Sequence, residues 1–229
     1  MEARIEFEEV APGATLVNRS YAVEDLAHEV ASIPTTAWRD LPYSSEWSQV
    51  KLVQDRIART DVEQLESVRR IVETLTKSPM DVTLTLLRPG GWTKTHRDIS
   101  GGGVFGVVRF HIPIVTPPGA EMKVSGQTLV PTAGELWILD TTYRHAVYNK
   151  GTADRIHLIV DVAKEDLPPE LIPVRGLRYR AHAAWFVLVA ALTLAGRAIR
   201  RPRGTAQAVQ RAVRLRVGRK SALSDLEAP

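Results

Sequence analysis

Apolar and polar residues follow two different spacings along this chain, and the change falls near Pro79. Before Pro79, apolar residues recur three or four positions apart, which is typical of amphipathic helices. We expect a short helix over residues 23–30 and a stronger one over residues 62–75, with Asp61 as its N-cap and Gln64 completing a capping box. The first third of the chain is therefore predicted to be mostly helical.

An aromatic segment with Trp38, Tyr43 and Trp47 separates these two helices. Pro42 and the neighbouring serines interrupt it, which predicts a loop that leads into a strand. The aromatic side chains could form a lid over a site, or they could pack the N-terminal helices against the rest of the domain. The sequence leaves both alternatives open.

After Pro79, apolar residues alternate with polar ones, as they do in half-buried strands. Strands are expected over residues 82–86, 108–114, 136–139 and 156–162. Glycine and proline mark turns between them, at Pro89-Gly90-Gly91 and Pro117-Pro118-Gly119. Short strands separated by such turns predict a sandwich or jelly roll. The fold class is therefore α+β, with N-terminal helices and a β core.

Two of the predicted strands carry charge or imidazole on the face opposite their apolar row. These polar faces hold Val107, Arg109 and His111 on one strand, and Arg155, His157 and Asp161 on the other. Because side chains alternate along a strand, such a face either meets solvent or lines the mouth of a barrel. The pattern alone slightly favours solvent.

A candidate metal site lies between these strands. His96 and Asp98 are two residues apart, on one face of an extended segment, so both can bind one ion. His145 adds a second imidazole, and two histidines with one carboxylate form the facial triad that leaves coordination positions of Fe(II) open. Arg155, on the next strand, could bind a carboxylate through two parallel hydrogen bonds.

Six short motifs occur in order across about residues 80–165. They are Leu87-Arg88-Pro89-Gly90-Gly91, His96-Arg97-Asp98, Arg109-Phe110-His111-Ile112-Pro113, Gly134-Glu135-Leu136-Trp137, His145-Ala146-Val147-Tyr148-Asn149 and Arg155-Ile156-His157-Leu158-Ile159-Val160-Asp161. In this region the chain resembles the aspartyl/asparaginyl β-hydroxylase family of Fe(II)/2-oxoglutarate-dependent oxygenases. The resemblance implies a double-stranded β-helix, a jelly-roll, cupin-like core.

The resemblance also implies roles for individual residues. Fe(II) would be bound by His96, Asp98 and His145, which would form the catalytic centre. The cosubstrate 2-oxoglutarate would be held by Arg155 on its distal carboxylate with help from Thr85, while cosubstrate or substrate oxygens would contact Arg109 and His111. With O₂ as the second cosubstrate, such an enzyme hydroxylates an unactivated carbon and converts 2-oxoglutarate to succinate and CO₂.

Two departures from the family pattern bear on the substrate. Asp98 completes a triad that the animal peptide hydroxylases of this family lack, and Val107 stands where they carry another arginine. The first 80 residues also show no helical repeat domain. We therefore expect a small-molecule or lipid substrate. The alternatives are a peptidyl aspartyl/asparaginyl β-hydroxylase and a non-catalytic, cupin-like metal-binding protein.

Composition limits the other possibilities. Among 229 residues, 44% are apolar and 24% are charged, which is typical of a globular protein. The absence of cysteine excludes disulfides, thiolate zinc sites, iron–sulfur clusters and a cysteine nucleophile. The acidic N-terminus has no apolar h-region, so we expect no secretory signal and a cytoplasmic protein.

The net charge of +4 is unevenly distributed. Residues 1–164 hold 18 Lys+Arg and 21 Asp+Glu, whereas residues 165–229 hold 12 and 5. We therefore expect an oxygenase domain over residues 1–174, with its motif core at 80–165, and a basic helical tail over residues 175–229.

The uncharged run at residues 183–196 of this tail is flanked by arginines and is too short to span a bilayer comfortably. It could lie at the inner face of the membrane as a peripheral contact, or pack on the barrel or on a second subunit, which leaves an oligomer possible. Nucleic-acid binding is disfavoured because few aromatic residues interleave with the arginines.

Overall fold

A computed structural model describes residues 4–41, 45–59, 65–98 and 103–200 of the chain. The chain divides into two compact units, Met1–Arg175 and Gly176–Pro229. The first unit holds all the strands of the described residues and two α-helices, and the second holds one long helix.

The first unit begins with strands rather than helices. Its N-terminal elements are β1 Phe7–Ala11, β2 Ala14–Ser20, α1 Glu24–Ala31, β3 Arg39–Asp40, β4 Ser45–Gln54, β5 Ile57–Ala58 and α2 Glu66–Leu75. The remaining strands are β6 Asp81–Trp92, β7 Val107–Val115, β8 Ala120–Val124, β9 Gln127–Leu129, β10 Glu135–Leu139, β11 His145–Asn149 and β12 Arg155–Ala163. Short 3-10 helices lie at Thr35–Ala37, Gly103–Phe105, Lys164–Asp166 and Pro169–Leu171.

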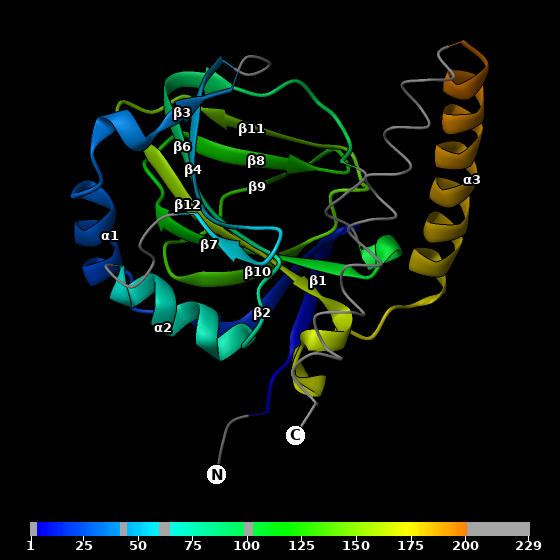
Figure 1. Ribbon diagram of the computed structural model, residues 1–229, viewed down its shortest axis with the longest axis horizontal. Coiled ribbons are helices and arrows are strands. Elements are labelled where there is room, and N and C mark those ends of the chain that lie inside the picture. The colour runs from blue at the N-terminus through cyan, green and yellow to red at the C-terminus, as the bar shows by residue number, and fades with distance from the viewer. Residues whose placement is uncertain (1–3, 42–44, 60–64, 99–102, 201–229) are drawn as a thin grey trace. The chain divides into compact units, whose positions relative to one another are not determined.

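The strands form one antiparallel sheet that curls nearly into a barrel (Figure 1). Its main path runs β1-β2-β10-β7-β12-β6-β11-β8-β9, and β4 adds a second partner along β6. The long strand β6 pairs with β12 and β4 over most of its length, and its last residue, Trp92, pairs with Tyr148 of β11. Strand β6 therefore joins the part of the sheet that contains β12 to the part that contains β11. This arrangement is consistent with the predicted jelly-roll core.

The apolar rows of β6, β7 and β12 face away from the barrel interior. They join the buried faces of α1 and α2 in one hydrophobic core, which includes Leu26, Ile71, Leu84, Phe110 and Val160. In Figure 1 both helices lie along the outside of this half of the sheet. A second, smaller apolar cluster lies between β8, β9, β11 and the β2–β10 pair. The polar faces of β7 and β12 are consequently turned into the barrel.

The two predicted N-terminal helices are confirmed, although the prediction that the first third is mostly helical is wrong. Strands β1 and β2 escaped detection because they are short and mix charged with apolar residues. The described part of α2 begins at Glu66, and the predicted capping residues Asp61 and Gln64 lie outside the described residues. At this end of α2, the carboxylate of Glu29 in α1 accepts hydrogen bonds from the backbone N–H and hydroxyl of Ser67.

The predicted strands after Pro79 are also present, with one correction. Pro89-Gly90-Gly91 was expected to form a turn, but it lies inside β6. Gly90 adopts a φ of 78°, which bends the strand without ending it. The bend lies between the part of β6 that pairs with β12 and Trp92, which pairs with β11.

The second unit contains α3, Leu177–Arg200, which extends the helix expected from the uncharged run. Several of its large apolar side chains are exposed. None of the helices in the described part of the chain combines the length and apolar character needed to cross a bilayer.

Gly134 offers a test of the packing between β2, β7 and β10. Its backbone joins Tyr21 and Pro113 through hydrogen bonds of 2.8 and 2.9 Å, its φ is +87°, and an added Cβ would overlap the carbonyl of Tyr21. The left-handed conformation alone costs a residue with a Cβ about 1–2 kcal/mol. We expect Gly134→Ala to lower the free energy of unfolding by clearly more than this amount. Gly126→Ala is the control, since Gly126 has a similar φ of +85° and open space around it. Equal losses in chemical denaturation would contradict the close contact.

Candidate metal centre

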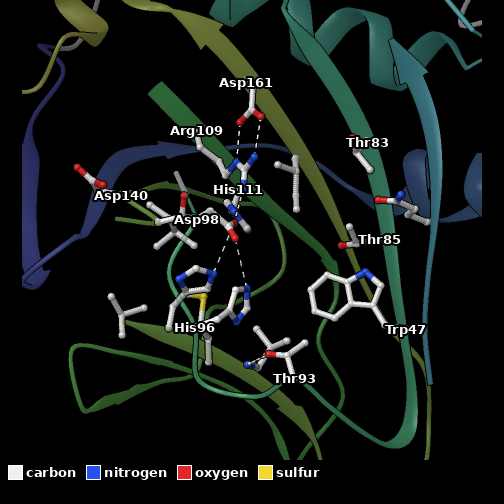
Figure 2. A pocket seen from close by; sticks show the side chains of 18 of the residues that line it. Trp47, Thr83, Thr85, Thr93, His96, Asp98, Arg109, His111, Asp140 and Asp161 are labelled. Atoms are coloured by element: carbon white, nitrogen blue, oxygen red, sulfur yellow. Dashed lines mark hydrogen bonds and ion pairs between the residues drawn. The ribbon is translucent and has the colours of Figure 1, made fainter. Parts of the chain in front are cut away.

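A cavity of about 360 Å³ opens inside the barrel, and the predicted metal ligands lie on its wall (Figure 2). Inward-facing side chains of β4, β6, β7 and β12 form one side, and those of β8 and β11 form the other. The polar strand faces therefore line a site rather than meet solvent, which corrects the preference drawn from the alternation alone.

The two histidines are positioned by the backbone as a pair. His96 and His145 exchange two backbone hydrogen bonds of 3.0 Å in an isolated β-bridge, and their ring centroids are 4.3 Å apart. Each ring has its Nδ1 near a carbonyl oxygen, of Lys94 at 2.7 Å and of Tyr143 at 3.1 Å. A carbonyl only accepts, so each Nδ1 carries the hydrogen, and in the neutral ring each Nε2 keeps a free lone pair.

Asp98 completes the cluster. Its Oδ1 lies 3.5 Å from His96 Nε2, and its Oδ2 lies 3.8 Å from His145 Nε2. One ligand atom from each of the three residues falls within 4.8 Å of the others, so the cluster could hold a metal ion. Burial lowers the pKa of His145, which keeps its ring neutral as coordination requires. The donor set of two imidazoles and one carboxylate fits Fe(II).

Arg109 connects the carboxylates of Asp98 and Asp161 through hydrogen bonds. Its Nε and Nη2 donate to the two carboxylate oxygens of Asp161 at 2.7 and 2.8 Å, and its Nη1 donates to Asp98 Oδ2 at 3.2 Å. Figure 2 shows Arg109 between the two aspartates. The Asp161 carboxylate opposes burial and raises the pKa of Arg109 above its ordinary value. The structure thus gives Arg109 carboxylate partners within the protein, and the contact with cosubstrate or substrate oxygens that the resemblance implies stays a prediction.

Deeper in the barrel, two histidines have polar atoms without a protein partner. Both ring nitrogens of His111 and the Nε2 of His157 are buried without a hydrogen bond to the described residues. Burial, with a smaller contribution from the charge of Arg109 or Arg155, lowers the pKa of each ring well below 6.5. Both imidazoles are therefore neutral, and each can donate one N–H to an acceptor.

Arg155 is buried beside this histidine pair, with 3% of its surface exposed. Its Nη2 donates to His157 Nδ1 at 3.2 Å, and among the described residues it has no ion pair with a carboxylate. Burial lowers the pKa of Arg155 to about 10. Arg155 is not among the residues lining the cavity, although Thr85, which pairs across the sheet with His157, does line it. A buried cation of this kind requires an anionic partner.

Strand β4 supplies three residues of the cavity wall, of which the sequence pattern suggests only Trp47, as part of a lid. Trp47, Gln49 and Lys51 line the cavity, and Lys51 Nζ donates to Thr83 Oγ1 at 3.0 Å. Their alternation with buried Ser48, Val50 and Leu52 is the period-two signal that could have identified this strand. Trp38, in contrast, packs against the larger hydrophobic core, and Tyr43 lies outside the described residues.

Comparison with known proteins agrees with this geometry. The family described as Aspartyl/Asparaginyl beta-hydroxylase matches residues 15–165, which is well over half of the chain. The chain belongs to this family. The match includes all seven residues assigned above to metal or cosubstrate, and it ends before α3 begins.

Solved structures share the fold at low sequence identity. An oxidoreductase of the 2OG-Fe(II) oxygenase family from Burkholderia pseudomallei is 12% identical over 69% of this chain and 88% of its own, with a TM-score of 0.51. A prolyl hydroxylase from Trichoplax adhaerens, solved with a hypoxia inducible factor peptide, is 10% identical over 69% and 86%, with a TM-score of 0.50. No curated protein sequence matches the chain closely enough to count as a relative. The family match places the chain among hydroxylases, and the solved structures show that it shares their fold.

Because Arg109 connects Asp98 to Asp161 through hydrogen bonds, we expect a change of either Arg109 or Asp161 to lower the affinity for the metal. Arg109→Lys removes the planar fork, and Asp161→Asn removes the carboxylate that orients it. We expect each variant to bind Mn(II), a redox-stable stand-in for Fe(II), roughly 10–100-fold more weakly in calorimetric titration.

Arg56→Gln is the matched control, because Arg56 forms a half-buried ion pair of 2.5 Å with Asp166 on another part of the domain. It should lower the unfolding temperature without changing the affinity for Mn(II). Wild-type affinity in both site variants would show that Asp98 needs no support from Arg109.

Proposed function

We propose that this protein is an Fe(II)/2-oxoglutarate-dependent dioxygenase that hydroxylates an unactivated carbon of a small-molecule or lipid substrate. One observation carries the proposal: both histidine rings of the cluster donate Nδ1–H to carbonyls, so both Nε2 atoms and Asp98 are available to one ion. Iron held by these residues would supply, with 2-oxoglutarate and O₂, the oxidising power for C–H hydroxylation, with succinate and CO₂ as the co-products.

The chain's own residues would bind, orient and shield. His96, Asp98 and His145 hold the ion, and the backbone bridge between the histidines fixes their separation. Arg109 keeps Asp98 Oδ2 engaged, which leaves Oδ1 as the oxygen without that hydrogen bond. The cavity wall would shield the reacting carbon only in part, because the side chain of His96 is 43% exposed.

The buried donors Arg155 and Thr85 suit a dicarboxylate. Arg155 is a cation without a carboxylate partner among the described residues, and Thr85 carries a hydroxyl on the adjacent cavity wall. We assign both to the distal carboxylate of 2-oxoglutarate. His111, whose nitrogens lack partners among the described residues, is assigned to a cosubstrate or substrate oxygen nearer the metal.

The cavity also carries an apolar wall, which supports a substrate with a hydrocarbon part. Met122, Val124, Leu139 and Val147 lie on it near the metal cluster, and Ile159 lies on β12. Val107, where the resemblance places an arginine, is buried and apolar. These features favour a small molecule or lipid over an aspartyl side chain.

Of the two alternatives, the peptidyl hydroxylase keeps specific support. The family as a whole is described by its action on aspartyl and asparaginyl residues, and Lys51 with Gln49 on the wall could bind a carboxyl or amide group. A non-catalytic metal-binding protein would retain the barrel and the metal without turnover. Product analysis by mass spectrometry, with peptides, lipids and small-molecule extracts as separate substrate pools, distinguishes the first alternative by which pool gains an oxygen atom.

The metal ligands provide the first test of catalysis. His96→Ala and His145→Ala should abolish iron- and O₂-dependent conversion of 2-oxoglutarate to succinate, because two remaining ligands hold Fe(II) poorly. His28→Ala, on the exposed surface of α1, should leave that conversion unchanged. Full turnover in either ligand variant at limiting iron would refute the assignment, and no turnover in the wild type with any substrate pool would favour the non-catalytic alternative.

Arg155 provides the second test. Arg155→Met keeps an unbranched apolar stem but removes the guanidinium group and its charge. We expect the 2-oxoglutarate concentration for half-maximal turnover to rise roughly 30-fold or more, from the about 2–5 kcal/mol lost when one partner of a buried charge pair is removed.

The same variant separates cosubstrate binding from a structural role. In the absence of 2-oxoglutarate, Arg155→Met should unfold at the same temperature as the wild type or higher, because it removes a buried cation that the protein does not pair. A large loss of stability together with an unchanged requirement for 2-oxoglutarate would assign Arg155 to the fold.

A further inference from the structure

The long helix α3 carries an exposed apolar stripe. Trp185, Leu188, Val189 and Leu192 occupy positions i, i+3, i+4 and i+7, and their exposed fractions are 48, 58, 37 and 64%. This spacing places all four side chains on one face of the helix. A contiguous exposed patch of large apolar residues usually marks an interaction surface.

Arginines flank the stripe in the sequence, and acidic residues are absent from this part of the sequence. Arg178 and Arg180 lie in the first turn of α3, and positions 197 and 200 near its end are arginines. No aspartate or glutamate occurs between Arg175 and Lys220. A surface that accepts the stripe must therefore combine an apolar layer with negative charge.

The helix has the length of a membrane span without its apolar character. It has 24 residues, which correspond to about 36 Å at 1.5 Å per residue. It is not apolar enough to cross a bilayer, and His182 lies one turn before the stripe. Trp185 stands at the start of the stripe, and tryptophan is typical of the boundary between acyl chains and head groups.

We propose that α3 binds the surface of an anionic lipid bilayer, with the stripe of Trp185, Leu188, Val189 and Leu192 inserted at the level of the head groups. The helix lies in the plane of the membrane, and Arg178 and Arg180 in its first turn contact phosphate or carboxylate groups of the lipids. This interaction is independent of the hydroxylase chemistry, because all proposed site residues belong to the first unit, Met1–Arg175.

Vesicle co-sedimentation of the full chain tests the proposal. The protein should sediment with vesicles of phosphatidylcholine that contain about a third phosphatidylglycerol, and less with phosphatidylcholine alone. Raising the salt concentration from about 0.05 M to about 0.5 M should weaken binding to the anionic vesicles, since screening shortens the range of the charge term. Arg178→Gln with Arg180→Gln should weaken it by about fivefold for each arginine.

Paired helix variants isolate the stripe. Leu188→Ser with Leu192→Ser should reduce partitioning into anionic vesicles roughly 10-fold or more. Ala184→Ser with Val187→Ser changes two exposed apolar residues on another face of the same helix and should retain most of the binding. Conversion of 2-oxoglutarate in solution serves as the folding control for all variants, and circular dichroism replaces it if the wild type shows no turnover.

Two results would overturn the proposal. One is a wild-type chain that stays in the supernatant with anionic vesicles at low salt. The other is equal partitioning of the stripe variant and the wild type, which would leave the arginines as a nonspecific attraction. A dimer that depends on Leu188 and Leu192 in light scattering, without vesicle binding, would assign the stripe to a second copy of the chain instead.

Discussion

The site depends on one constraint of strand geometry, which is that successive side chains point to opposite faces of the sheet. In β7 and β12 one row is wholly apolar, and it must be buried. Helices α1 and α2 cover that row from outside, in a core that includes Leu26, Val68 and Phe110. The opposite row is then forced into the barrel, with Arg109 and Asp161 directly across from each other. The hydrophobic effect thus determines which charges become neighbours.

Backbone hydrogen bonds then fix the positions of the candidate metal ligands. The bridge between His96 and His145 is reinforced on both sides, because Thr93 N donates to the Val147 carbonyl at 2.9 Å and Asp98 N donates to the Thr141 carbonyl at 2.8 Å. Three ligands from two distant parts of the chain are consequently held by hydrogen bonds of ordinary length. A site built this way needs little reorganisation to accept an ion, and preorganisation of this kind is what a catalytic metal centre requires.

The sequence predicted the central strands, and it singled out His96 and Asp98 as candidate ligands, because these signals are local. His96 and Asp98 are two residues apart, and β7 and β12 alternate over nine residues each. Strands β8 and β9, with five and three residues, are too short for an alternation to emerge. The partner of Arg109 depends on the register between two strands whose paired residues are 52 positions apart, and no local pattern determines that register.

The charges around the site bear on how the proposed metal and cosubstrate would bind together. Among the residues that line the cavity, the cations Lys51 and Arg109 accompany the carboxylates of Asp98, Asp140 and Asp161. The buried cation Arg155 lies outside this lining. A divalent ion would offset the excess of carboxylates on the wall, and a dicarboxylate would offset the charge of the ion together with that of Arg155. Under the proposed function, each ligand would therefore strengthen the binding of the other by the same factor.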